Sequence, residues 1–229
     1  MREEVRVEIT PTQSVTALVY SATGRERAGI TLILGHGAGA GQTSGFMVTL
    51  ATELAARGFD TATFNFCYME DGRRVPDPND KLEACYRAVI ETIRDHEKFG
   101  RNALVIGGKS MGGRIASQIA AQDAVDLAGL VLLGYPLHPP GRPENLRVRH
   151  LSDVKAPMLF VQGSRDTFGT PAELQPFIKK LKPPAQLYVV EGGDHSFKVP
   201  KRSSLTQQEV YEAVYEQIGE WLRATIAIC

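Results

Sequence analysis

The sequence of 229 residues lacks several features that mark whole classes of protein. Its longest apolar run, residues 127–133, is interrupted by Gly129 and is far shorter than the ~20 residues that a membrane-spanning helix needs. The first residues contain no apolar stretch of the kind found in an export signal. Lys plus Arg and Asp plus Glu number 26 each, so there is no basic excess of the kind that attracts nucleic acid. We therefore expect a cytoplasmic protein that binds neither membranes nor nucleic acid.

Cysteine is also scarce. Cys67, Cys85 and Cys229 form no C-x-x-C pair, which favours reduced thiols over disulfides. No set of His, Asp and Glu has the spacing of metal ligands, and we expect no cofactor. A chain of this length can bury a sizeable core without a disulfide or metal, and its composition is 43% hydrophobic. We therefore expect residues 1–229 to form a single domain.

What the sequence does contain is an alternation of strand-like and helix-like segments. Alternating apolar residues before residue 21 predict an antiparallel hairpin whose first strand lies at an edge. Continuous apolar runs are typical of strands buried on both faces; they occupy residues 30–34, 59–66, 103–106, 127–133, 158–161 and 187–190. Helical periodicity lies between them, in residues 46–57, from Leu82 to near Gly100, and after a capping box at Thr206–Glu209. This order is typical of a mostly parallel sheet covered by helices on both faces.

Two connections have the composition of surface loops. Residues 68–79 are polar and rich in turn formers, and residues 135–151 carry four prolines. The second connection leaves little room for a helical lid, so we expect an open, shallow pocket. In sheets of this kind ligands bind outside the carboxyl ends of the strands, where these loops begin.

A glycine-rich turn joins the strand at residues 103–106 to a helix. Within it, residues 108–112 (GKSMG) fit the G-x-S-x-G pattern of a nucleophile elbow in the required strand–turn–helix context. The glycines allow strand and helix to approach closely, and the strained turn presents the serine hydroxyl. We therefore predict Ser110 as nucleophile. The N–H of Met111, at the start of the helix, is then placed to stabilise a developing oxyanion.

Two phosphate-binding motifs are matched only in part. A P-loop requires G-x-x-x-x-G-K-S, but the residue five before Gly108 is Ala103, inside the strand, so no loop remains to surround a phosphate. Residues 35–40 (GHGAGA) fit the G-x-G-x-x-A pattern of a dinucleotide site. Such a site needs an acidic residue at the end of the next strand, and residues 64–67 (FNFC) supply none. A nicotinamide enzyme is the weaker alternative.

The loop at residues 35–41 (GHGAGAG) is better explained as the second part of an oxyanion site. Acyl transfer places negative charge on the former carbonyl oxygen, and a second fixed N–H donor lowers that barrier. We predict that the N–H of Ala38 is this donor, beside that of Met111. His36 is expected to shape the loop through hydrogen bonds rather than to transfer protons.

A base and an orienting acid follow in the order Ser, Asp, His that is found with this elbow. Asp166 comes just after the strand at residues 158–161, and His195 just after the strand at residues 187–190. Asp194 is too close to His195 in the chain to orient its ring, so it is expected to shape the turn. The remaining histidines are expected to be exposed or structural, with His138 and His150 as alternatives for lining the pocket.

Together, the segments GKSMGGR, HGAGAG, QGSRD and GGDHSF resemble the α/β-hydrolase fold superfamily over residues 15–225. They are most similar to its small lidless branch related to dienelactone hydrolases, in a bacterial group whose eukaryotic relatives include a chromatin-complex subunit and a testis-expressed protein. Dienelactone hydrolases have cysteine where this chain has Ser110, so their substrate is not carried over. The chain also has Lys109 where histidine is more usual.

The resemblance implies an α/β-hydrolase fold without a large lid, and a serine hydrolase of carboxylesterase type. In it, Ser110 is the nucleophile, His195 the base and Asp166 the orienting acid, with Ala38 and Met111 forming the oxyanion site. The expected partner is a small acyl substrate. A thioesterase or peptidase with the same triad, and a binding module that has the fold but no catalysis, are the alternatives; the natural substrate and the oligomeric state stay open.

Overall fold

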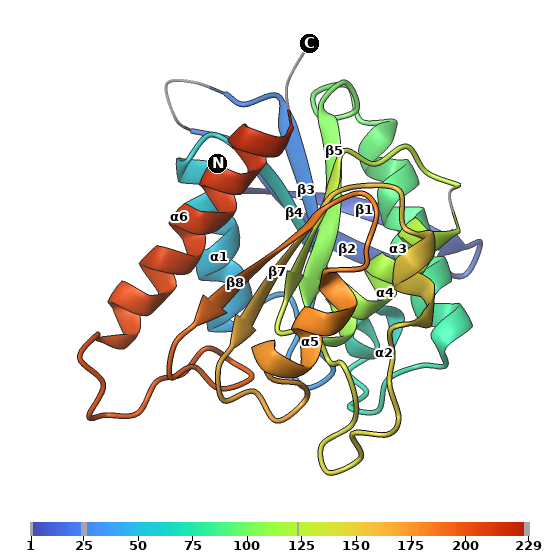
Figure 1. Cartoon of the computed structure of the whole chain (residues 1–229). Coiled ribbons are helices and arrows are strands. Elements are labelled where there is room, and N and C mark those ends of the chain that lie inside the picture. The colour runs from blue at the N-terminus through green and yellow to red at the C-terminus, as the bar shows by residue number, and fades with distance from the viewer. Residues whose placement is uncertain (1, 24–26, 123, 227–229) are drawn as a thin grey trace.

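The computed structural model describes residues 2–23, 27–122 and 124–226, so the prediction for Cys229 lies outside the described residues. Its centre is an eight-stranded sheet in the order β1-β2-β4-β3-β5-β6-β7-β8 (Figure 1). The strands are β1 (Arg2–Thr10), β2 (Gln13–Tyr20), β3 (Ile30–Gly35), β4 (Asp60–Phe64), β5 (Ala103–Lys109), β6 (Gly129–Leu133), β7 (Met158–Gly163) and β8 (Ala185–Val190). β2 is antiparallel to β1 and β4, and β3 to β8 are parallel.

Helices cover both faces of this sheet (Figure 1). They are α1 (Gly45–Ala56), α2 (Cys67–Glu70), α3 (Asn79–Arg94), α4 (Met111–Ala121), α5 (Pro171–Ile178) and α6 (Gln207–Thr225), with a short 3-10 helix η1 (Arg149–Asp153). α1 and α6 pack on one face, and α3 and α4 pack on the other. The predicted class, an α/β-hydrolase fold with a mostly parallel sheet and an N-terminal hairpin, is therefore confirmed.

The central strands are mostly apolar because both of their faces are buried. Side chains alternate between the faces of a strand, so Ile33 of β3 packs under α3 and α4 while Leu32 and Leu34 pack under α1. The hairpin strand β1 is half exposed, as its alternating pattern predicts, because it lies at the sheet edge.

Several local predictions differ from the structure. β8 is half exposed rather than buried on both faces, because it forms the other edge of the sheet. α3 ends at Arg94, and turns rather than helix lead to Gly100. The loop predicted at residues 68–79 begins inside α2, and Tyr68 is fully buried. α5 was not predicted, although Thr170 and Glu173 form a capping box at its start.

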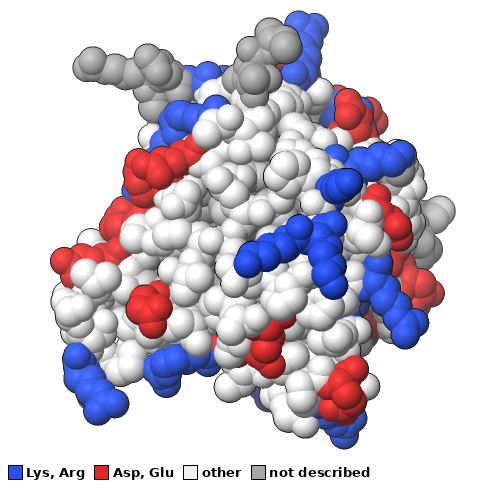
Figure 2. Space-filling model, viewed as in Figure 1, with Lys and Arg blue, Asp and Glu red and all other residues white. Residues whose placement is uncertain are grey.

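The connection between β6 and β7 contains η1 and otherwise irregular chain, so no helical lid covers the carboxyl ends of the strands within the described residues. Both signs of charge are interspersed over the face in Figure 2, in keeping with the net charge of zero. None of the helices in the described parts of the chain combines the length and apolar character needed to cross a membrane.

Candidate active site

Ser110 occupies a sharp turn between β5 and α4. Its backbone has φ 50° and ψ −111°, a strained combination for a residue with a side chain. Gly108 and Gly112 on either side lie against the backbone of Gly35 so closely that a Cβ at either position would collide with it. The glycines of the G-x-S-x-G pattern therefore allow β5, β3 and α4 to meet, and this packing holds the strained turn in place.

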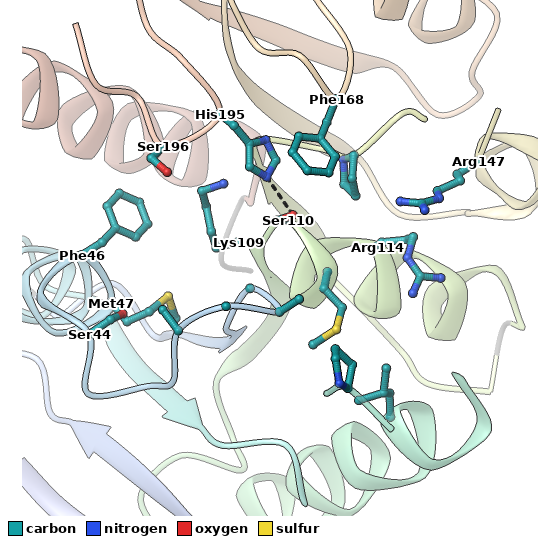
Figure 3. Close-up of a pocket in the computed structure, with 18 of the residues that line it drawn as sticks. Ser44, Phe46, Met47, Lys109, Ser110, Arg114, Arg147, Phe168, His195 and Ser196 are labelled. Carbon is teal, nitrogen blue, oxygen red and sulfur yellow. Dashed lines mark hydrogen bonds between the residues drawn. The ribbon is translucent and has the colours of Figure 1, made fainter. Parts of the chain in front are cut away.

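In the structure, the side chains predicted as nucleophile, base and orienting acid (Ser110, His195 and Asp166) are connected in one row by hydrogen bonds. Nε2 of His195 lies 2.9 Å from Oγ of Ser110, and Nδ1 lies 2.8 Å from Oδ2 of Asp166. The residues follow β5, β7 and β8, whose carboxyl ends lie at the same edge of the sheet, and the contact between Ser110 and His195 is visible in Figure 3. Residues separated by 85 and 29 positions in the chain are thus adjacent in space.

Asp166 is almost fully buried and is surrounded by donors. Gln162 donates from Nε2 to Oδ2 at 2.8 Å, and the N–H of Phe168 donates to Oδ1 at 2.8 Å. Because these bonds stabilise an ionised carboxylate, Nδ1 of His195 is its donor. Nε2 is then free of a proton in the neutral ring and accepts from the Ser110 hydroxyl.

Two neighbours of this row were missed by the sequence analysis. Gln162 bonds to Asp166, and its Oε1 accepts from the N–H of Tyr135 at 2.8 Å. The ring of Phe168 stacks on that of His195, with centroids 4.2 Å apart. The only signal in the sequence is a polar residue, Gln162, inside an otherwise apolar strand.

Asp194 has the structural role that was predicted for it. Its Oδ1 accepts hydrogen bonds from the N–H groups of Ser196 at 2.7 Å and Lys198 at 2.9 Å. These bonds close the turn that follows His195. The carboxylate that contacts the imidazole ring is that of Asp166.

The loop after β3 is fixed by side-chain hydrogen bonds. Nδ1 of His36 donates to the carbonyl of Gly37 at 2.7 Å, and Nε2 accepts from the N–H of Phe66 at 3.1 Å. Burial lowers the pKa of His36, which favours the neutral ring that these two bonds require. The hydroxyl of Tyr68 donates to the carbonyl of Ala38 at 3.0 Å and so fixes the orientation of that peptide.

A cavity of about 830 Å³ opens beside Ser110. This volume lies in the upper part of the usual range for small-molecule sites. Ala38 and Met111, the predicted oxyanion residues, both line it with Ser110 and His195. Figure 3 shows labelled side chains on both sides of Ser110: Phe46, Met47 and Lys109 on one side, and Arg114, Arg147 and Phe168 on the other.

Lys109 is the residue directly before the serine, and its side chain lines the pocket. Its ammonium nitrogen lies 5.6 Å from the centre of the Phe197 ring. Loss of hydration lowers the pKa of Lys109 to about 8, although the carboxylates of Asp166 and Asp194 act in the opposite direction. A buried ammonium group beside the serine is therefore part of the electrostatic environment of this site.

The other predicted groups lie away from the pocket lining. His150 bonds to Ser117, His138 bonds to the carbonyl of Pro139, and His96 contacts Glu3. Cys67 and Cys85 are buried and free of disulfides. Within the described ranges, no three His, Cys, Asp or Glu side chains are arranged to hold a metal ion.

A serine on a strand–turn–helix elbow, with a carboxylate and an imidazole from two later strands, is the arrangement of the α/β-hydrolase fold. Residues 28–223 match the model of the alpha/beta hydrolase domain family, and the chain belongs to this family.

Solved structures with the same fold cover nearly the whole chain. A dienelactone hydrolase from Anabaena variabilis is 18% identical with a TM-score of 0.77, and the match covers 99% of each chain. An α/β serine hydrolase without lid from Xanthomonas campestris is 19% identical with a TM-score of 0.75, covering 100% of this chain and 96% of the other. Est1E from Butyrivibrio proteoclasticus is 16% identical with a TM-score of 0.73, covering 96% of this chain and 98% of the other. At these identities the likeness establishes the fold.

Proposed function

We propose that this protein is a serine hydrolase of carboxylesterase type, which cleaves ester bonds of small acyl substrates through an acyl-enzyme on Ser110. The observation that carries the proposal is the unbroken row of contacts from Ser110 through His195 to Asp166, at 2.9 and 2.8 Å. Membership of the alpha/beta hydrolase domain family supports a hydrolase. The names of structural neighbours, which include an esterase domain from Rhodothermus marinus and a lidless serine hydrolase, point the same way.

With Asp166 ionised and the neutral ring of His195 protonated on Nδ1, Nε2 of His195 can accept a proton. His195 takes the proton of Ser110 as the serine oxygen attacks the acyl carbon, and Asp166 stabilises the imidazolium that forms. The imidazolium then protonates the leaving alcohol. Water, activated by the same imidazole, releases the acid from Ser110 and restores the free enzyme. The cycle needs water as co-substrate and no cofactor.

The oxyanion is assigned to the N–H groups of Met111 and Ala38. Met111 is the first residue of α4, so its N–H has no acceptor four residues earlier within the helix. The N–H of Ala38 shares its peptide with the carbonyl of Gly37, which accepts from Nδ1 of His36 at 2.7 Å. The next peptide is held through the carbonyl of Ala38 by the hydroxyl of Tyr68. Fixed donors of this kind lower the barrier because they need no reorganisation as negative charge develops.

A fluorophosphonate probe tests this proposal, because it reacts with a serine that is activated by a neighbouring imidazole. We expect one covalent adduct on Ser110 by mass spectrometry, none in Ser110→Ala, and much slower labelling in His195→Ala. Ser44→Ala is the matched control, since Ser44 lines the same pocket and makes no side-chain capping bond at the start of α1. Labelling of the control at the wild-type rate is expected.

Absence of labelling in the folded wild-type protein would contradict the proposal and favour a binding module with the same fold. Where Ser110 does react, a comparison of one acyl group presented as oxygen ester, thioester and aminoacyl amide identifies the leaving group. We expect the oxygen ester to give the highest kcat/KM. A higher value for the thioester or the amide would make the protein a thioesterase or a peptidase.

A further inference from the structure

Two arginines line the pocket on one side of Ser110. Arg114 lies on α4, and its backbone N–H bonds to the carbonyl of Ser110, one helical turn earlier. Arg147 lies in the connection between β6 and β7. Figure 3 shows the two guanidinium groups on the same side of the cavity. Two positive charges on one side of a pocket repel each other, so a group that offsets this repulsion is expected there.

The backbone of Arg147 is fixed on both sides. Its N–H donates to the carbonyl of Leu137 at 2.8 Å, and its carbonyl accepts from the hydroxyl of Tyr135 at 2.6 Å. Tyr135 is held in turn by Gln162, the residue that bonds to Asp166. The position of Arg147 is therefore tied to the same framework that holds the catalytic carboxylate.

Neither guanidinium forms an ion pair with a carboxylate in the part of the chain that the structure describes. Arg114 donates from Nη1 to Oδ1 of Asn79 at 2.9 Å and to Oε1 of Gln118 at 3.0 Å, and both acceptors are uncharged. No carboxylate of the described residues lies within ion-pair distance of Arg114 or Arg147. Asp77, which also lines the cavity, is paired with Arg73 at 2.8 Å.

The surroundings of Arg114 disfavour its charged form. Burial lowers the pKa of Arg114, and the positive charge of Arg147 lowers it further, while Tyr135 and Glu83 oppose this less strongly. An anion between the two groups would remove their repulsion and satisfy the donors that remain free. Guanidinium groups bind carboxylate and phosphate oxygens through paired, charge-assisted hydrogen bonds.

We propose that Arg114 and Arg147 bind an anionic oxyacid group, a carboxylate or a phosphate, on the ester that is cleaved at Ser110. The inference rests on the proposed function and narrows its substrate class. Arg114 follows Ser110 by one helical turn, a rise of about 5.4 Å, and both arginines line the pocket that Ser110 lines, so the anionic group and the reacting carbonyl share one cavity. The preferred substrate is therefore a short acidic ester rather than a neutral one.

The kinetic test compares two esters of the same length. Monomethyl glutarate carries a free carboxylate, and the methyl ester of glutaramic acid carries a neutral amide in its place. We expect release of methanol with a kcat/KM at least about tenfold higher for the acidic ester, the effect of roughly one charge-assisted hydrogen bond. Added salt should reduce this preference. Equal kcat/KM values for the two esters would overturn the proposal.

Arg147→Gln should reduce the ratio of the two kcat/KM values about tenfold or more. Arg149→Gln is the matched control, because Arg149 is exposed, lies two residues away and makes the same change of charge outside the pocket lining. We expect the control to keep the wild-type ratio. If the two variants change the ratio equally, the effect is one of overall charge and the proposal fails.

A binding experiment separates this proposal from the proposed function. Glutarate and inorganic phosphate are titrated calorimetrically into Ser110→Ala, which cannot form an acyl-enzyme. Binding of either anion that is lost on adding Arg147→Gln, and kept on adding Arg149→Gln, supports the anion site even if the wild type hydrolyses no ester. The tighter of the two anions identifies carboxylate or phosphate as the group that is recognised. Absence of binding by both would overturn the anion site, while Ser110 labelling would still stand or fall separately.

Discussion

The backbone of Gly112, at the start of α4, lies against the carbonyl group of Gly35, at the end of β3, so closely that no side chain fits at position 112. This contact joins the elbow that carries Ser110 to the loop that carries Ala38. Together with the contact of Gly108 on Gly35, it positions the two parts of the proposed oxyanion site relative to each other.

Gly112→Ala should lower the free energy of unfolding by about 3 kcal/mol, because the new methyl group meets backbone that cannot move aside. It should also slow fluorophosphonate labelling of Ser110. Gly45→Ala in α1 is the control, since a Cβ there meets nothing within 4 Å. Urea denaturation should show this control unchanged or slightly more stable. Equal stability of the two variants would contradict the role given to the Gly35–Gly112 contact.

Asp166→Asn should reduce kcat by about three to four orders of magnitude while the protein stays folded. The carboxylate of Asp166 accepts from His195 and Gln162 at Oδ2 and from the N–H of Phe168 at Oδ1. An amide has one oxygen, so its NH2 group faces a donor in either orientation and the imidazole is no longer held in the required tautomer. Asp194→Asn, which alters the carboxylate next to His195 in the chain, should cost less than tenfold. Steady-state ester hydrolysis measures both, and similar losses would refute the assignment of Asp166.

The buried ammonium group of Lys109 predicts a pH-dependent stability. Loss of hydration lowers its pKa to about 8, against a value of 10.5 in the unfolded chain. Between these pH values the unfolded chain binds the proton and the folded protein does not, so the free energy of unfolding gains a contribution that rises with pH. Below pH 8 both states are protonated, and burial of the charge is fully unfavourable.

Lys109→Met should remove this contribution and make the protein more stable than the wild type at pH 7. The difference between variant and wild type should then shrink as the pH rises from 8 to 10.5. Urea denaturation at a series of pH values measures it. Lys198→Met, at an exposed position of the same pocket lining, should follow the wild-type curve. A Lys109→Met difference that is constant across this pH range would count against the burial of charge at Lys109.

The hydroxyl group of Tyr86, on α3, contacts both β3 and β5 next to the elbow. Its hydroxyl lies 2.6 Å from the carbonyl of Ile33 and 2.8 Å from that of Gly107, and it accepts from the N–H of Gly107 at 3.0 Å. Tyr86→Phe leaves that buried N–H without a partner and should cost about 1–3 kcal/mol of unfolding free energy. Tyr20→Phe is a control of the same chemistry, because the buried hydroxyl of Tyr20 has no hydrogen-bond partner among the described residues. Thermal denaturation should show the control no less stable than the wild type.

Much of the fold could be predicted because its signals are local. The continuous apolar runs mark strands covered on both faces, and the capping box at Thr206 and Glu209 marks the start of α6, where the structure has it. The prediction was wrong for β8, because an apolar run does not reveal which strand lies at the edge of the sheet. It missed α5, whose eight residues include two prolines and are too few for a clear helical period.

The sequence by itself determined which residues carry the candidate chemistry: a serine on a glycine turn, then an aspartate and a histidine, each just after a strand. It determined this because glycine spacing and strand ends are features of a few consecutive residues. The tertiary structure alone decided how these residues are supported. The order of β5, β6, β7 and β8 brings Phe168 onto His195 and Arg147 beside Arg114, and the turn after β7 folds Asp166 back onto Gln162. The first two contacts join residues far apart in the chain, and all three depend on packing, which no local pattern encodes.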